Sequence, residues 1–239
     1  MRRTPRIIQF LALFTSLALL PSSAFAADPQ RNDIRWVSST PLDDLPAAYL
    51  AESPEHGFDA WIAPDGVRAR ARDGTWWVGL ALVAVGRDGA MEEAAPAGVE
   101  ARENRAELHR GSLTEWYVND ERGLEQSFTL TERPAGARGD ELVLALELTG
   151  DLMPLVAGNG RRLDLLRPGH PVPVLHYSGL TVVDAEGLEL PARLELGVGT
   201  EGGGRWLRIV VADADAVYPV TVDPLLTTAV WSSSESDDT

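Results

Sequence analysis

The hydrophobic residues of this chain recur at alternate positions over short runs, and this spacing predicts strands rather than helices. The clearest run is 141–148, in which every second residue is leucine. Side chains alternate between the two faces of a strand, so these leucines share one face, whereas a helix would scatter them around its circumference. Residues 76–85 are apolar on both faces, which favours a central strand followed by a turn at 87–89.

Similar runs continue through the second half of the chain. They occupy 172–183, 188–196, 206–212 and 217–222. The residues at 184–187 begin with Asp and end with Gly, which fits a type I turn. Because Pro219 and Pro224 flank most of the last run, we expect it to be an edge strand or to be bounded by its prolines. Residues after about Leu226 are expected to be flexible.

The predicted fold class is all-β, an antiparallel β-sandwich built as one large or two small sandwich subdomains. One short N-terminal helix is expected at 45–50, where Asp44 could cap it. The predicted organisation is a signal peptide at 1–26, a lead-in with the short helix at 27–57, a β-sandwich region at 58–226 with a possible seam near 134–171, and a flexible tail or the start of a missing repeat array at 227–239.

The first 26 residues have the three parts of a signal peptide. An arginine-rich start precedes an apolar run at 7–20, and Ala-Phe-Ala at 24–26 is a typical cleavage site. The run of about 14 residues is shorter than the roughly 20 that a spanning helix needs. We therefore expect a secreted or cell-surface protein that begins at Ala27 and has no membrane span after cleavage.

The charge and the cysteine count exclude several partners. The whole chain has a formal net charge of −15, and the expected mature chain keeps 18 arginines against 36 acids, a net charge of −18. Such a negative field repels phosphate backbones, so we expect no nucleic-acid partner. The chain has no cysteine, so its core must hold it together without disulfides and it has no cysteine for an N-terminal lipid anchor.

Two glutamates form the most suggestive catalytic pattern. Glu115 and Glu125 lie on what look like adjacent strands, with Trp116 and Tyr117 beside the first. Two carboxylates near aromatic side chains suit a glycoside hydrolase, which is one alternative function. The simpler interpretation is that residues 119–123 form the hairpin turn and both acids face water.

Other candidate sites have simpler explanations. His170 and His176 lie on one side of an extended strand but about 20 Å apart, too far to share a metal ion without a fold-back. Ser178 lacks the motif of a hydrolase nucleophile. Asp213 and Asp215 suit a turn better than a calcium site. We therefore expect no enzymatic activity, no catalytic residue, no cofactor and no bound metal.

Tryptophan is frequent for a chain of this length. The seven are Trp36, Trp61, Trp76, Trp77, Trp116, Trp206 and Trp231. Most lie in apolar runs, so core packing is the expected role. The second alternative function, a carbohydrate-binding module, requires two or three exposed, coplanar aromatic rings on one sheet face.

Several short segments resemble a known protein family. They lie at 110–119, 122–130, 175–180, 184–187, 190–195 and 218–225, where the last reads Tyr-Pro-Val-Thr-Val-Asp-Pro-Leu. Together they resemble the N-terminal region of exported bacterial proteins that carry FG-GAP, integrin-alpha-like β-propeller repeats. The likeness covers about residues 58–231.

The resemblance implies a non-enzymatic exported β-domain that precedes or presents such a repeat array in a bacterial surface or secreted protein. Its implied partner is the chain's own downstream repeat domain, if the chain is a fragment. The calcium-binding repeat segments of the family do not occur in this sequence, so no calcium ligand is carried over to any residue here. The carbohydrate-binding module and the glycoside hydrolase remain open alternatives.

Overall fold

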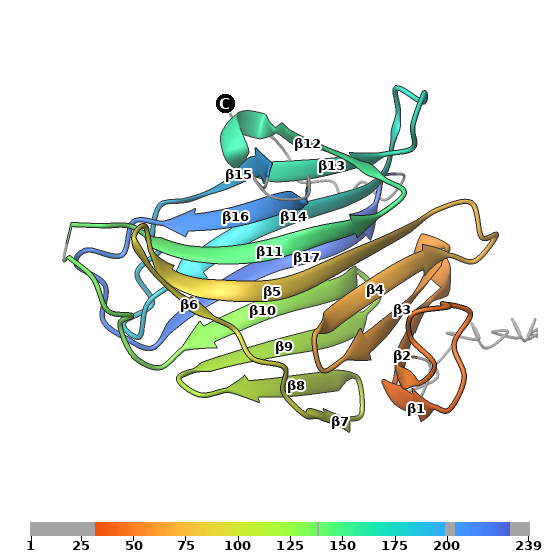
Figure 1. Ribbon diagram of the computed structural model, residues 1–239, viewed down its shortest axis with the longest axis horizontal. Helices are drawn as coiled ribbons and strands as arrows, with labels where there is room; N and C mark the ends of the chain where they lie inside the picture. The colour runs from red at the N-terminus through yellow and green to blue at the C-terminus, as the bar shows by residue number, and fades with distance from the viewer. Residues whose placement is uncertain (1–31, 138, 199–203, 230–239) are drawn as a thin grey trace, which may run out of the picture.

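The computed structural model describes residues 32–137, 139–198 and 204–229. The predicted signal peptide and the last ten residues of the predicted tail lie outside the described residues. Two antiparallel sheets stack face to face in a sandwich-like arrangement, which confirms the predicted fold class (Figure 1). We call the nine-stranded sheet, nearer the viewer in Figure 1, the front sheet, and the eight-stranded sheet the back sheet.

The front sheet takes its strands from both halves of the chain. Across the sheet they are β1 (Arg35–Val37), β2 (Ala48–Ser53), β3 (Phe58–Ala63), β4 (Gly66–Ala71), β5 (Trp77–Arg87), β11 (Leu142–Gly150), β16 (Arg205–Val211) and β15 (Ala192–Val198), with β6 (Ala90–Glu93) paired to β5. The predicted central strand at 76–85 therefore does lie in the middle, as β5.

The back sheet has an equally mixed order. Across the sheet its strands are β12 (Met153–Ala157), β13 (Arg162–Leu166), β14 (Pro173–Val183), β17 (Val220–Thr228), β10 (Gly123–Leu130), β9 (Leu113–Asp120), β8 (Arg105–Arg110) and β7 (Val99–Arg102). Two short 3₁₀ turns, η1 (Pro54–His56) and η2 (Gly158–Gly160), lie in connections.

The core lies between the sheets and follows the alternation in the sequence. The four leucines of β11 all point inward and are buried, as predicted; they are Leu142, Leu144, Leu146 and Leu148. Leu144 lies between Val85 of β5 and Ile209 of β16 in the ladder. Buried residues of both sheets form one cluster that extends from Ile34 to Leu226.

A single glycine allows the β9–β10 hairpin to approach β17 closely. Gly123 has a φ of +131°, and a Cβ placed there would lie 2.3 Å from the carbonyl oxygen of Leu226. A larger residue would push β10 away from β17, because real Cβ atoms do not approach an oxygen so closely. The predicted hairpin turn at 119–123 is confirmed, since Asp120 pairs with Gly123.

The short helix predicted at 45–50 is wrong. Residues from Ala48 onward form β2, which pairs with β3, and Leu45 lies in a turn bridged to Leu42. Asp44 binds Arg68 through its side chain. Asp followed closely by Pro is a turn signal as well as a capping signal. In β2, Ala51 is buried whereas the residues on either side of it are partly exposed, as expected for a strand.

The prediction of an edge position for the last strand is also wrong. β17 lies between β14 and β10, in the middle of the back sheet, and extends to Thr228. Pro224 is accommodated there because the β14 register shifts between Ser178 and Thr181, directly opposite this part of β17. A bulge is one of the few places where a sheet tolerates proline.

The turn predicted at 184–187 is present but joins the two sheets. The Gly187 N–H donates to the Asp184 carbonyl at 3.0 Å, and the Asp184 carboxylate accepts the N–H groups of Glu186, Leu188 and Val217. These bonds hold the pKa of Asp184 below its usual value. The strands on either side, β14 and β15, belong to different sheets, so this turn closes one end of the sandwich.

Candidate functional site

The carboxylate of Glu115 is buried between the two sheets. On β9 the inward positions are Leu113, Glu115, Tyr117 and Asn119, and Glu115 is 0% exposed. Its partner is Arg110 at the end of β8, which donates from Nε at 3.0 Å and from Nη2 at 2.8 Å. The expectation that this acid faces water is therefore wrong.

Three further polar side chains complete a network around Glu115. Tyr117 donates its hydroxyl to Glu115 at 2.5 Å, and Gln126 donates its amide at 2.9 Å. Tyr177 of β14 in turn donates to the Gln126 carbonyl at 3.0 Å. Burial, followed by the charge of Glu115, raises the pKa of Tyr117 well above its usual value, and the same two causes raise that of Tyr177. The Glu115 carboxylate thus accepts four hydrogen bonds. Such full hydrogen bonding is typical of a structural polar network in a protein core.

Glu125 lies on the opposite face of the same sheet. Glu115 is paired with Phe128 of β10, so the inward residues of β10 are even-numbered and Glu125 points outward. The two glutamates that suggested a glycoside hydrolase are separated by the sheet and cannot flank one bond. The expectation that Glu125 faces open water is also wrong, because the side chain is largely buried on that outer face.

Glu125 instead neighbours Asp223 of β17. Ser127 donates its hydroxyl to Asp223 at 2.6 Å and lies 3.5 Å from Glu125, while Arg122 binds Glu125 at 2.8 Å. Burial and then the negative charge of Asp223 raise the pKa of Glu125. Trp116 lies beside Ser127 in the ladder, with the Arg105 guanidinium 4.0 Å from its ring centre. Sequence reasoning missed this pair because its members are about a hundred residues apart.

The second buried charge cluster is centred on Asp213. Arg87, at the end of β5, donates to both carboxylate oxygens of Asp213 at 3.0 and 2.8 Å, and both side chains are 0% exposed. Arg133 and Tyr218 also donate to Asp213, at 3.0 and 2.6 Å. Burial alone would raise the pKa of Asp213, but the hydrogen bonds from Arg87 and Tyr218 outweigh it and lower the pKa. The turn predicted at 213–215 is present and carries this cluster.

The other candidate residues do not converge. His176 on β14 holds the Asp164 carboxylate through Nδ1 at 2.7 Å, whereas His170 is exposed in the turn between β13 and β14. Ser178 lies on β14, where it pairs with Leu225. In the described part of the chain, no three His, Asp or Glu side chains are grouped so that they could hold a metal ion.

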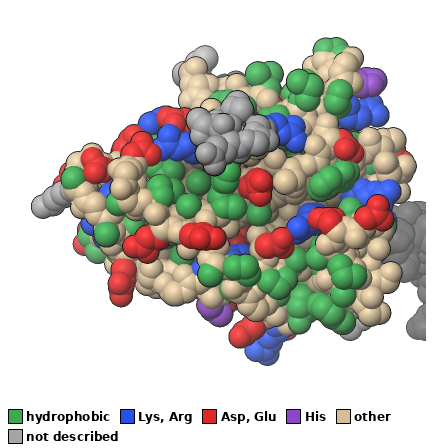
Figure 2. Space-filling model, in the orientation of Figure 1, with side chains coloured by type: hydrophobic (Ala, Val, Ile, Leu, Met, Phe, Trp, Pro, Cys, Tyr) green, Lys and Arg blue, Asp and Glu red, His purple; other side chains and the backbone are tan. Residues whose placement is uncertain are grey.

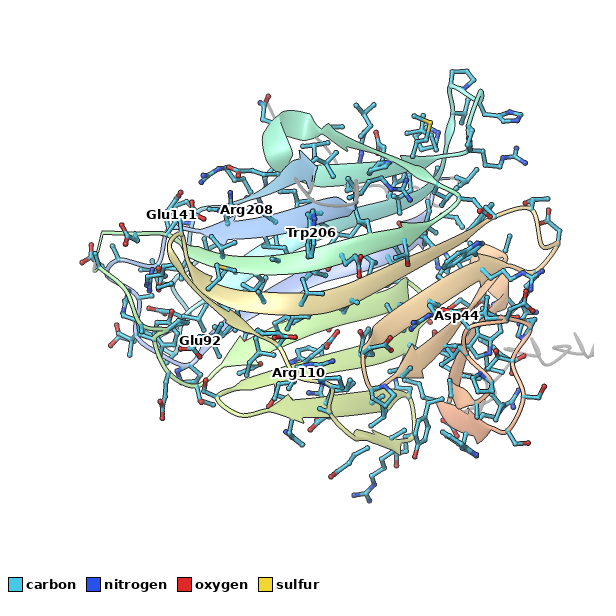
Figure 3. The ribbon with its side chains drawn as sticks, viewed as in Figure 1. Asp44, Glu92, Arg110, Glu141, Trp206 and Arg208 are labelled. Atoms are coloured by element: carbon cyan, nitrogen blue, oxygen red, sulfur yellow. The ribbon has the colours of Figure 1, made fainter. Side chains whose placement is uncertain are left out.

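An apolar hollow lies on the outer face of the front sheet. Figure 2 shows hydrophobic side chains gathered over the middle of this face. The hollow is lined by Val83, Ala84, Met91, Val143, Ala145 and Trp206. Arg208, two positions from Trp206 on β16, forms part of its rim and binds Asp88 (Figure 3). Small side chains on two adjacent strands, β5 and β11, create the depression, and the indole of Trp206 forms one wall.

Core packing was the expected role of the tryptophans, and only some of the remaining ones are buried. Trp61 and Trp76 are buried, and Trp77 and Trp116 are half-buried. Trp36 is exposed and packs edge-on against Tyr49.

Comparison with protein-family models, with curated proteins and with solved structures found no match. Within the described ranges, none of the helices is both long and apolar enough to cross a membrane.

Proposed function

We propose that this chain is a non-enzymatic, exported β-sandwich that holds and presents the polypeptide following it, an integrin-like FG-GAP repeat array in a bacterial surface or secreted protein. The position of β17 carries the proposal. This last strand is hydrogen-bonded to β14 on one side and to β10 on the other. Any load applied beyond Ala229 is therefore shared by two ladders in the middle of a sheet.

The placement of the acidic residues supports a structural role. Glu115 and Asp213 are each saturated by neighbouring arginine and tyrosine side chains inside the fold. A catalytic carboxylate needs a free position from which to reach a substrate. These two carboxylates instead stabilise the arrangement of the strands that carry them.

A force measurement tests the proposal. The exported chain is pulled between its N-terminus and its C-terminus, and unfolding should occur in one step because β17 must shear two ladders at once. In the control, the C-terminal handle moves to Met153→Cys on the edge strand β12, which among the described strands pairs with β13 alone. That strand should peel away at lower force. Extraction of β17 as a separate low-force step would contradict a presenting role.

An activity measurement tests the non-enzymatic part. Hydrolysis of a glycan by the purified chain, abolished by Glu125→Gln but not by Glu141→Gln, would overturn it. Glu141 is a suitable control because it is a half-exposed, arginine-paired acid that lies just before β11 of the other sheet.

The hollow around Trp206 favours one second function, binding of a saccharide or another flat, partly apolar ligand. An indole beside small side chains offers an apolar surface, and Arg208 and Glu93 offer polar contacts at its rim. Trp206→Ala should then remove binding to a glycan panel, whereas Trp36→Ala, on the exposed β1 strand, should not.

A further inference from the structure

The chain leaves the described structure beside the hairpin that joins β13 to β14. Thr227 pairs with His176 and Thr228 with Leu175, and the Ala229 N–H then donates to the Val174 carbonyl at 3.5 Å. The ladder is antiparallel, so each further residue of the chain moves one position back along β14, toward residues 167–173. This hairpin projects from the body of the sandwich (Figure 1).

The hairpin and the adjacent edge strand expose apolar side chains. Met153 and Leu155 on β12 are each 55% exposed, and Val172 is 67% exposed. We call these three residues the hairpin patch. Leu155 is paired with Asp164, Asp164 with His176, and His176 with Thr227, so the patch shares the outer face of the back sheet with the last residues of β17. Apolar groups grouped in this way on a surface indicate a binding partner.

The same hairpin is basic in an acidic protein. Residues 161–176 contain three arginines and two histidines against one acid, Asp164, whereas the whole chain has a net charge of −15. Arg167, at the base of the hairpin, has a buried Nε atom without a hydrogen-bond partner. Figure 2 shows hydrophobic, basic and histidine side chains together at this projection.

The sequence that follows Ala229 has the complementary composition. Residues 230–239 begin with Val-Trp and continue with three acids, Glu235, Asp237 and Asp238, and no basic residue. If the β17–β14 register continues by two residues, Trp231 falls opposite Val172. The apolar start of this segment would then meet the hairpin patch, and its acidic end would continue along the turn that carries Arg167 and His170.

We propose that the hairpin patch is the binding surface for residues 230–239, with Trp231 on Val172 and the acids of the segment near Arg167 and its neighbours. The contact deepens the proposed function and rests on it for its biological meaning: it sets the direction in which the following polypeptide leaves the sandwich. The binding itself is a property of this chain alone. Apolar contact and charge attraction act together, with the attraction screened by salt.

Engineered cysteines test the proposal cleanly, because the natural chain has none. The exported chain carries Trp231→Cys together with Val172→Cys. The matched control carries Trp231→Cys with Val217→Cys, a second exposed valine that lies just before the other end of β17. A third variant pairs Trp231→Cys with Met91→Cys in the front hollow. A disulfide requires Cα atoms within about 7 Å.

We expect the Val172 pair to cross-link at least about tenfold faster than either other pair and than the same pair carrying Met153→Ser and Leu155→Ser, in which the tether from Ala229 is unchanged and only the docking surface is lost. Similar rates in all pairs, or a faster Met91 pair, would overturn the proposal. Equal urea midpoints of the reduced variants and the parent confirm that folding is unchanged. Failure of the cross-link with one-step force unfolding intact would reject the docking alone and leave the proposed function standing.

The charge contribution is tested in the same assay. The triple variant Glu235→Gln, Asp237→Asn and Asp238→Asn should slow the Val172 cross-link, and 1 M salt should slow the parent pair to a similar rate, because it shortens the Debye length to about 3 Å. An unchanged rate in both experiments would overturn the electrostatic part of the proposal.

Discussion

The Asp213→Asn substitution should destabilise the protein strongly, because it leaves the Arg87 charge without a counter-charge in the core. Asp213 accepts two bonds from Arg87 and one each from Arg133 and Tyr218. An asparagine offers one acceptor oxygen and turns an amide N–H₂ toward guanidinium donors. Breaking a buried ion pair by removing one partner costs about 3–5 kcal/mol.

Urea unfolding of the exported chain measures this cost. At a slope of about 2–3 kcal/mol/M, the midpoint should fall by roughly 1–2 M with the slope unchanged. Asp88→Asn is the matched control, since Asp88 also pairs with an arginine, Arg208, but its side chain is 78% exposed. That control should cost less than about 1 kcal/mol. Equal costs for the two substitutions would refute the argument from burial.

A double variant and a pH series separate charge from packing. Arg87→Met added to Asp213→Asn removes the stranded charge, so the two costs should couple by about 0.5–3 kcal/mol. The pKa of Asp213 is lowered in the folded state, so its ionised form stabilises the fold above the unfolded pKa, and this contribution is lost as the pH falls through the folded pKa. The cost of Asp213→Asn should therefore be largest near neutral pH and shrink in acid.

Three other outcomes are expected. Leu144→Ala should cost about 2–5 kcal/mol in urea unfolding, against a small effect of Leu188→Ala at an exposed position. Glu125→Gln should be neutral or stabilising at pH 7, because a raised folded pKa means that ionised Glu125 destabilises the fold as the pH rises above its unfolded pKa; a large loss of stability would contradict this sign. Intact-mass analysis of exported protein should give a chain that begins at Ala27, and retention of Met1 would contradict the predicted signal peptide.

The sequence revealed the strands whose inward positions are all apolar. The alternating leucines of β11 predicted which side of that strand faces the core, and the apolar run of β5 predicted a central strand. Both predictions are confirmed. On β9 the same alternation places Glu115 on the face of Leu113 and Tyr117. That spacing was the available signal that this acid is buried, but an acid in a polar hairpin is more often at the surface.

Long-range pairing could not be predicted in the same way. Arg87 and Asp213 are 126 positions apart, and each lies in a segment that composition alone identifies as a turn. Pro224 favoured an edge strand because proline lacks the N–H that a central strand donates to its neighbour. The sequence of one strand does not show whether its neighbour carries a bulge at that point. The bulge that accommodates it belongs to β14, about forty-five residues earlier in the chain.

The Asp213 cluster and the start of the last strand lie at the same end of the sandwich. Asp213 follows β16 of the front sheet, and its partners Arg133 and Tyr218 follow β10 and precede β17 of the back sheet. The cluster therefore fastens the two sheets together at the end of the sandwich where β17 begins. Since β17 then crosses the middle of the back sheet to reach Ala229, a strain applied to the following polypeptide is transmitted through β17 to this cluster. On this reasoning, loss of Asp213 should lower the unfolding force measured from the C-terminus more than the force measured from the edge strand β12.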